Sequence, residues 1–393
     1  MPKTTRIAGA AVAGALLFSA GAAGSAAAQP TSPGQPPSGP ERQDTCPLAG
    51  AEITATASID SERTDLFAGY GDSGQGWTGG DSTYSVQLRD GSLAWIFSDT
   101  FLGPVHEDGS RPESTPFLNN SIIVQDGQDL TTVTGGSEGA PESIVGPGTD
   151  SDWSWFGAGL RTRTGDLQVG VLEFARFGEG YWDWGWSSNS LATIDTDSWE
   201  LVDVQPLPSD GNIQWASWYQ RIGGHVYVYG VEDLGAEKYL HVAKVLGGDL
   251  TALDRWRYWD GASWQTDETA STRVLKDVAN EYSVTPYRDG YLLVTQDTST
   301  PFSSEIRAYT SCSPVGPFSN PTTLYHMPEV GSAGTYGNPN VIAYNAHEHP
   351  ELREGDTLLV TYNVNSMDSS DLYNDVSIYR PRFIKVELDV TTP

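Results

Sequence analysis

The chain has 393 residues, of which 38% are hydrophobic and 11% aromatic, so most of it can fold around a buried core. It carries 22 Lys and Arg against 51 Asp and Glu, and the resulting formal charge of −29 repels phosphate backbones and excludes nucleic-acid binding. The only two cysteines, Cys46 and Cys312, exclude a disulfide-framework mini-protein and a Cys-rich zinc module.

The first 28 residues have the pattern of a secretory signal peptide. Lys3 and Arg6 give the charged start, an apolar run follows, and three alanines at 26–28 form a small-residue cleavage site. Glycines interrupt the apolar run, and no later stretch is apolar enough to span a bilayer. We therefore expect a secreted, extracellular protein with no membrane association after cleavage.

Residues 29–44 form a linker rich in Pro, Gly and Ser, which predicts a flexible connection. Cys46 follows this linker, whereas Cys312 lies late in the chain. In an oxidising compartment the two cysteines could form a disulfide, although sequence spacing alone leaves their geometry open.

The rest of the chain is dominated by hairpins. In five segments a short alternating run, a tight Gly turn and a β-branched or aromatic run follow one another. The turns are Asp90-Gly91, Gly165-Asp166, Gly223-Gly224, Asp289-Gly290 and Gly355-Asp356. They lie 75, 58, 66 and 66 residues apart, which fits one four-stranded blade per hairpin.

Five blades predict an all-β, five-bladed β-propeller in one domain spanning residues 45–393. The alternative is a β-sandwich with coincidentally spaced hairpins. The last apolar segment, from Tyr379 to Val390, is expected to complete a blade with the N-terminal region.

Polar residues at the starts of the inner strands should converge on the central channel of a propeller. Asp81 lies near the start of the first hairpin and Asp99 near its end, so antiparallel pairing places both carboxylates at one end of the hairpin. Two carboxylates in unlike environments can divide the roles of a glycosidase. We predict Asp81 as nucleophile or base and Asp99 as the acid; the alternative is that both residues only satisfy turns.

Aromatic residues alternate in two segments, Trp153 to Trp155 and Tyr181 to Trp186. Most of the 13 tryptophans should pack between blades, but this density also suits a wall on which sugar rings stack. We predict Trp155, Trp186 and Trp215 as substrate contacts.

Four further polar residues are predicted to bind substrate. Glu281 and His347 precede or open a predicted strand, and Asn119 and Asn120 open another. His347 and His349 are two residues apart on a strand, which does not match a zinc-site pattern, so we expect neither a metal nor another cofactor.

Several motifs resemble a family of secreted actinobacterial proteins, long classed as a domain of unknown function, that contains endo-D-arabinanases. They are GWTGGDSTYSVQLRDGSLAWIFSDTFLGP, RPESTPFLNNSIIVQDG, HEHPEL, LLVTYNVNS and YRPRFIKVEL. The family is similar to the five-bladed arabinanase and fructosidase superfamily. The resemblance implies a propeller glycoside hydrolase whose two key aspartates match Asp81 and Asp99. In the superfamily an acidic residue on a later blade acts as the acid, and Glu173 and Glu281 are the candidates for it here.

The sequence thus favours a secreted glycoside hydrolase that cleaves furanosidic linkages of an arabinan-type polysaccharide. Its expected partner is a polysaccharide or oligosaccharide substrate. The alternatives are a carbohydrate-binding propeller without catalytic activity and, less favoured, a polysaccharide lyase.

Overall fold

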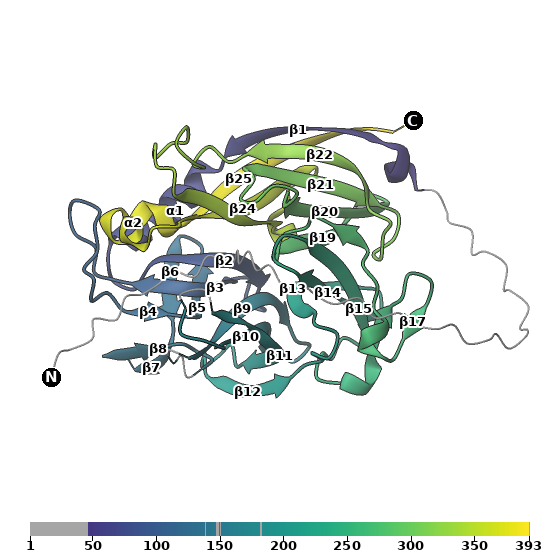
Figure 1. Cartoon of the computed structure of the whole chain (residues 1–393), viewed down its shortest axis with the longest axis horizontal. Helices are drawn as coiled ribbons and strands as arrows, with labels where there is room; N and C mark the ends of the chain where they lie inside the picture. Colours follow the sequence, from purple (N-terminus) through teal and green to yellow (C-terminus); the bar gives the residue numbers. More distant parts are fainter. Residues whose placement is uncertain (1–45, 138, 147–148, 150, 181–182, 393) are drawn as a thin grey trace, which may run out of the picture.

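Each of the five predicted hairpins forms two neighbouring strands of a separate sheet (Figure 1). The computed structural model describes residues 46–137, 139–146, 149, 151–180 and 183–392. In this part of the chain the five sheets are arranged as the blades of a β-propeller, which confirms the predicted fold. The predicted signal peptide and linker lie outside the described residues.

Every blade has an antiparallel order that runs from an inner strand outward. Blade 1 consists of β2 (Trp77–Gln87), β3 (Leu93–Leu102), β5 (Ser121–Asp126) and β6 (Asp129–Val133), with the short β4 (Phe117–Leu118) beside β3. Blade 2 consists of β9 (Asp152–Arg161), β10 (Leu167–Arg176), β11 (Trp184–Ile194) and β12 (Leu201–Pro206). A two-stranded hairpin, β7 (Gly135–Ser137) and β8 (Ala140–Glu142), lies between them in the sequence.

The remaining blades follow the same scheme. Blade 3 consists of β13 (Gln214–Ile222), β14 (His225–Asp233), β15 (Lys238–Leu246), β16 (Trp256–Trp259) and β17 (Trp264–Gln265), with β18 (Leu275–Lys276) paired to β15. Blade 4 consists of β19 (Tyr282–Tyr287), β20 (Gly290–Gln296), β21 (Glu305–Ser311) and β22 (Ser319–His326). Blade 5 consists of β23 (Val341–Glu348), β24 (Thr357–Ser366), β25 (Pro381–Thr391) and β1 (Glu52–Ile59).

The inner strands surround the channel. β2 contacts β9, β9 contacts β13, β13 contacts β19 and β19 contacts β23, while β24 of blade 5 contacts β2 and completes the circle. The side chains of these strands that face the channel therefore come from all five blades.

The two ends of the described chain close the ring. β1 pairs with β25 over its whole length, from Glu52 opposite Thr391 to Ile59 opposite Ile384. The expectation that the last strand completes a blade with the N-terminal region is thereby confirmed. A disulfide between Cys46 and Cys312 also links the segment before β1 to the end of β21.

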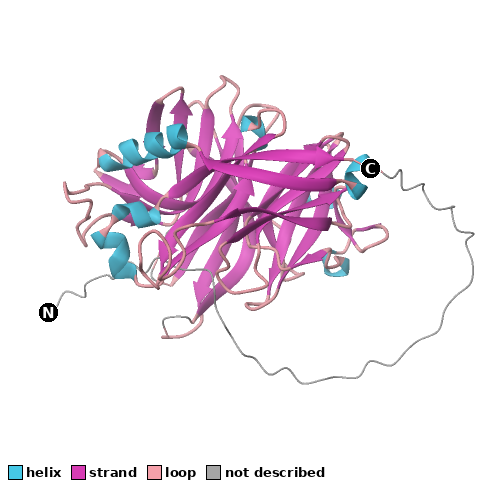
Figure 2. Cartoon of the chain, turned by 90° about the horizontal axis from the view of Figure 1, so that it is seen from above, coloured by secondary structure: helices cyan, strands magenta, loops and turns pink. Residues whose placement is uncertain are grey.

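The two α-helices of the described residues lie at one end of the propeller. α1 (Ser61–Asp72) follows β1 and α2 (Ser369–Asn374) follows β24, and the views in Figures 1 and 2 place both at the same end of the molecule. Phe67 of α1 is buried against Trp77, Trp95 and Phe383, so this helix covers the junction of blades 1 and 5.

The short 3-10 helices lie in turns: η1 (Pro47–Gly50), η2 (Leu253–Arg255), η3 (Glu268–Ala270), η4 (Pro350–Leu352) and η5 (Val376–Tyr379). None of the helices in the described ranges is long and apolar enough to cross a membrane.

One predicted strand start needs correction. His347 was expected to open the inner strand of blade 5, but β23 begins at Val341 and His347 is its penultimate residue. The reason is that η4 lengthens the connection from β23 to β24, so the strand lies earlier than the turn at Gly355 suggests.

Candidate active site

Asp81 lies in an irregular part of β2. The pairing of β2 with β3 shifts between Gly80 and Ser82 and again between Ser82 and Tyr84. Ser82 and Thr83 both have positive φ angles, 72° and 64°, which non-glycine residues seldom adopt. Such a bulge allows consecutive side chains to reach one site instead of pointing to opposite faces.

The Asp81 carboxylate is buried and is held by two tyrosines. Its Oδ2 accepts hydrogen bonds from the hydroxyl groups of Tyr344, at 2.6 Å, and Tyr379, at 2.9 Å. Burial raises the pKa of Asp81 to about 6, although these hydrogen bonds and the backbone amides of Asp81 and Asp99 lower it. Asp81 therefore changes charge close to neutral pH.

Asp99 on β3 is also buried but has different partners. Its Oδ1 accepts hydrogen bonds from the indole N–H of Trp155, at 2.7 Å, and from Nδ2 of Asn119, at 3.0 Å. N–H donors of this kind stabilise the negative charge of a carboxylate.

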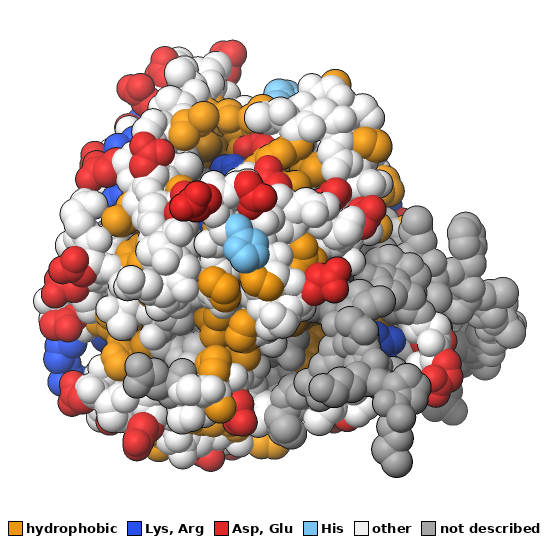
Figure 3. Space-filling model, turned by 90° about the vertical axis from the view of Figure 1, so that its left-hand side faces the viewer, with side chains coloured by type: hydrophobic (Ala, Val, Ile, Leu, Met, Phe, Trp, Pro, Cys, Tyr) orange, Lys and Arg blue, Asp and Glu red, His pale blue; other side chains and the backbone are white. Residues whose placement is uncertain are grey.

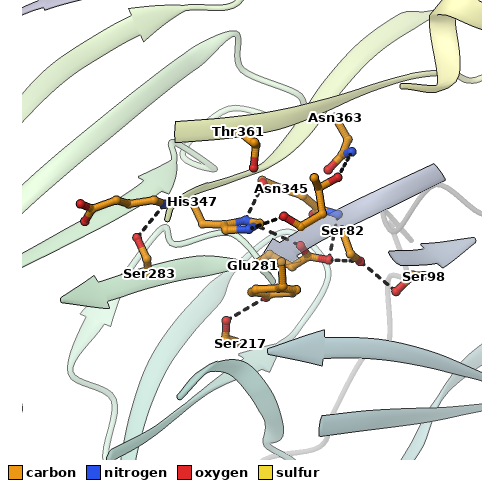
Figure 4. A network of polar contacts seen from close by, with 12 residues as sticks. Ser82, Ser98, Ser217, Glu281, Ser283, Asn345, His347, Thr361 and Asn363 are labelled. Atoms are coloured by element: carbon orange, nitrogen blue, oxygen red, sulfur yellow. Dashed lines mark hydrogen bonds and ion pairs between the residues drawn. The ribbon is translucent and has the colours of Figure 1, made fainter. Parts of the chain in front are cut away.

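Glu281 enters the same site from blade 4, one residue before β19. Its Oε1 accepts hydrogen bonds from the Ser82 hydroxyl, at 2.6 Å, and from Nδ2 of Asn345, at 2.9 Å (Figure 4). Its Oε2 is buried without a hydrogen bond to any described residue. Burial, and after it the negative charge of Asp81, raise the pKa of Glu281 well above its usual range.

His347 lies next to Glu281. Its ring is fully buried and stacks on Tyr84 with 4.4 Å between centroids, and its Nδ1 lies 3.9 Å from Oε2 of Glu281. Burial lowers the pKa of His347 to about 4, so the ring is neutral at neutral pH. The prediction that His347 contacts the substrate directly is wrong, because its ring has no exposed surface.

The three carboxylates share a neighbourhood. The charges of both Asp81 and Asp99 contribute to raising the pKa values of the Tyr344 and Tyr379 hydroxyls, after burial as the main cause. Asp81 and Glu281 are close enough for the charge of Asp81 to act on Glu281. The predicted convergence of Asp81 and Asp99 agrees with this arrangement, and Glu281 joins them.

Glu173, the other predicted candidate for a later-blade acid, has a different setting. It lies on β10, the second strand of blade 2, and its Oε2 accepts a hydrogen bond from the Ser154 hydroxyl at 2.6 Å. No contact joins it to Asp81 or Asp99 in the described structure, so Glu281 fits that position better.

Two of the predicted tryptophan contacts belong to an aromatic cluster beside Asp99. Trp153, Trp155, Phe174 and Trp184 pack together in blade 2, and Trp186 packs against them while half-buried. Trp155 is 9% exposed and donates to Asp99, so this cluster joins the site to the surface of blade 2.

The structure corrects two other predicted substrate contacts. Trp215 has no exposed surface; its indole N–H donates to Oε1 of Glu268 at 2.7 Å, and its ring packs against Trp256. Asn120 is equally buried, and its amide bonds the backbone of Val145 and Ser154. Both residues connect elements of the fold. Asn119 remains at the site through Asp99.

Sequence reasoning missed Tyr344, Asn345 and Tyr379. Tyr379 lies within one of the resembling motifs, but nothing local shows that η5 directs its hydroxyl to Asp81. Tyr344 and Asn345 lie at a second bulge, where the pairing of β23 with β24 shifts between Tyr344 and His347. An irregularity of this kind leaves no trace in an alternating pattern.

The described residues contain no cluster of three or more His, Cys, Asp or Glu side chains arranged to hold a metal ion. The groups gathered at the site are the carboxyl, hydroxyl, amide and indole groups of the residues named above.

The surface at the end that carries the helices is rich in acidic side chains. Figure 3 looks onto this end, and acidic and hydrophobic side chains lie side by side around a hollow in it. The fold and the site together define a five-bladed propeller in which the carboxyl groups of Asp81, Asp99 and Glu281 gather from blades 1 and 4.

The chain belongs to the DUF5005 family, described as a domain of unknown function, whose model matches residues 64–388. No curated protein sequence matches the chain. Among solved structures, a protein from Bacteroides ovatus with a provisional description as a hydrolase has a TM-score of 0.71 at 21% identity, over 84% of this chain and 90% of that one. This likeness concerns the fold.

Two more distant structures are glycoside hydrolases. A family 117 glycoside hydrolase from Zobellia galactanivorans has a TM-score of 0.45 at 11% identity, over 87% of this chain and 91% of that one. The catalytic domain of a family 62 α-L-arabinofuranosidase from Coprinopsis cinerea has a TM-score of 0.44 at 11% identity, over 81% of this chain and 93% of that one.

Proposed function

We propose that this protein is a secreted glycoside hydrolase that cleaves furanosidic linkages in an arabinan-type polysaccharide, with D-arabinan as the favoured substrate. The observation that carries the proposal is that the carboxyl groups of Asp81 and Glu281 share one site, where Ser82 next to Asp81 donates to Glu281, and that the pKa values of both groups are raised. Glycosidic cleavage needs one protonated and one ionised carboxyl group in the same site.

The environments assign the two roles. Because burial and the neighbouring charge of Asp81 favour its neutral form, Glu281 is the general acid that protonates the departing oxygen. Asp81 has a pKa of about 6 and is ionised in much of the protein at neutral pH, so it acts as base or nucleophile. The two groups titrate as a coupled pair, and the loss of the first proton makes the loss of the second harder.

Asp99 has a third role in this proposal. The sequence favoured it as the acid, but Glu281 fits that role better, and Oδ1 of Asp99 is engaged by Trp155 and Asn119. Asp99 is therefore assigned a supporting role, in which it accepts a hydrogen bond from a sugar hydroxyl and stabilises positive charge that develops on the ring.

The choice of substrate has separate support. The motifs around Asp81 and Asp99 resemble those of proteins that include endo-D-arabinanases. The aromatic cluster at Trp155 and Trp186 offers rings on which sugars can stack. The predicted signal peptide agrees with a polymer substrate that cannot enter a cell.

The test is incubation of the purified protein with D-arabinan-containing arabinogalactan, plant arabinan, galactan and fructan, followed by reducing-end assay and chromatography. Asp81→Asn and Glu281→Gln should each lower turnover at least about 1,000-fold. Glu173→Gln is the matched control, since it changes a carboxylate outside the site, and should keep activity within about twofold of the wild type.

An aryl furanoside with an acidic phenol separates the two roles. Such a leaving group needs no proton, so Glu281→Gln should regain turnover on it while Asp81→Asn stays inactive. Retention of glycan without new reducing ends would instead support a carbohydrate-binding propeller. Ultraviolet absorbance from an unsaturated product would support a lyase.

A further inference from the structure

Two bulges lie in the neighbouring blades 1 and 5, and each sends consecutive side chains into the site. In β2, Asp81 contacts Tyr344 while Ser82 contacts Glu281. In β23, Tyr344 donates to Asp81 while the next residue, Asn345, donates to Glu281. Asn345 has a φ angle of 60°, so both bulges contain residues in the left-handed region.

The side-chain hydrogen bonds of Asp81 fall on one of its two oxygens. Both tyrosine hydroxyls donate to Oδ2, whereas Oδ1 is buried and accepts no hydrogen bond from a described side chain. The two tyrosines therefore fix the position of Oδ2 and stabilise the negative charge of the carboxylate.

The hydroxyl groups of Tyr344 and Tyr379 keep the protons that they donate to Asp81. Nδ2 of Asn365 donates to the Tyr344 hydroxyl at 2.9 Å, which occupies its oxygen and leaves its hydrogen for Asp81. Burial, and after it the charge of Asp81, raise the pKa of both tyrosines well above the usual range, so neither loses its proton near neutrality.

We propose that Tyr344 and Tyr379 are positioning residues that hold the Asp81 carboxylate in place and keep it ionised during turnover. This inference rests on the proposed function only in taking Asp81 as a reacting carboxylate. The effect of the tyrosines on the charge of Asp81 can be measured without any substrate.

The first measurement is a pH titration of protein labelled with ¹³C at the aspartate carboxyl carbons. The resonance that disappears in Asp81→Asn belongs to Asp81. Tyr344→Phe and Tyr379→Phe each remove one donor to its charged form, so the titration midpoint of Asp81 should rise by about one pH unit in each variant. Tyr70→Phe is the control, because the Tyr70 hydroxyl forms its hydrogen bonds with Thr132, and should leave the midpoint unchanged.

The second measurement uses the same variants in turnover. With a substrate in hand, Tyr344→Phe and Tyr379→Phe should move the acidic limb of the pH–rate profile upward by the same amount, lower kcat about tenfold and leave KM within about twofold. Unchanged Asp81 midpoints in both variants would overturn the inference. Raised midpoints in a protein that hydrolyses no glycan would leave the inference intact and reject the proposed function.

Discussion

The indole N–H of Trp155 donates to Oδ1 of Asp99 over 2.7 Å and so joins blade 2 to blade 1 at the site. The tryptophan is thus both a member of an aromatic cluster and a hydrogen-bond donor to a buried carboxylate. Its two contributions can be separated by a substitution that keeps a ring and removes the N–H.

Trp155→Phe should lower kcat about 10- to 100-fold, because a hydrogen bond to a charged group contributes about 1.5–3 kcal/mol. Trp153→Phe is the matched control. Trp153 lies in the same cluster, and its indole N–H has no hydrogen-bond partner among the described residues. Steady-state kinetics measure kcat for both variants. Equal losses of kcat would mean that only the packing of the cluster, and not the hydrogen bond to Asp99, affects turnover.

Asp81 should make the protein less stable as pH rises. Its pKa is raised in the folded protein from the usual 3.8 to about 6. Because the folded state favours the protonated form, the contribution of Asp81 to the free energy of unfolding is fully present below about pH 4. It is lost as the pH rises to about 6. Its full size is about 3 kcal/mol as an upper estimate.

Asp81→Asn should therefore unfold at a higher urea concentration than the wild type at pH 7.5, while the two proteins should be much closer at pH 4. Equilibrium urea unfolding at both pH values measures this difference. A difference that does not vary with pH would show that the ionisation of Asp81 is not the cause.

The blade arrangement could be predicted from the sequence because each hairpin carries its own local signal. A turn pair with glycine fixes where two strands meet, and five such pairs at similar spacing define five blades. The signal concerns only neighbouring residues, which is why the start of β23 was placed too late when η4 lengthened its connection.

The tryptophans show where prediction from the sequence ends. Trp155 and Trp215 both lie near the start of an inner strand within similar aromatic and small-residue patterns. Their roles differ because of their tertiary partners. The indole of Trp155 donates to Asp99 at the site, whereas the indole of Trp215 donates to Glu268 within the fold. The proximity of Asp81 and Asp99 could be predicted because one hairpin joins them, whereas Tyr344 and Tyr379 reach Asp81 from more than 250 residues away.

Trp215→Phe should affect stability and not substrate binding. The substitution leaves a cavity under a fully buried ring and removes the hydrogen bond to Glu268, a loss of about 2–4 kcal/mol in the free energy of unfolding. KM should stay within about twofold of the wild-type value. A large rise in KM with unchanged thermal stability would restore Trp215 as a substrate contact.

The disulfide between Cys46 and Cys312 should stabilise the closed ring. It joins residues 266 apart, so it restricts the unfolded chain over most of the propeller. A crosslink over a loop of this length contributes up to about 5 kcal/mol in the chain-entropy estimate. In the folded protein Cys46 precedes η1 and β1, and Leu48 of η1 is buried in the core of blades 4 and 5.

The variant with both Cys46→Ser and Cys312→Ser should consequently unfold at a lower urea concentration, by about 2–5 kcal/mol in free energy. Its turnover below the unfolding transition should stay close to that of the wild type, because the bond is on a segment that does not contact Asp81, Asp99 or Glu281. Urea unfolding and a rate measurement on the same samples test both statements. Lost activity in a variant that stays folded would mean that the N-terminal segment shapes the site, whereas unchanged stability would mean that the pairing of β1 with β25 closes the ring unaided.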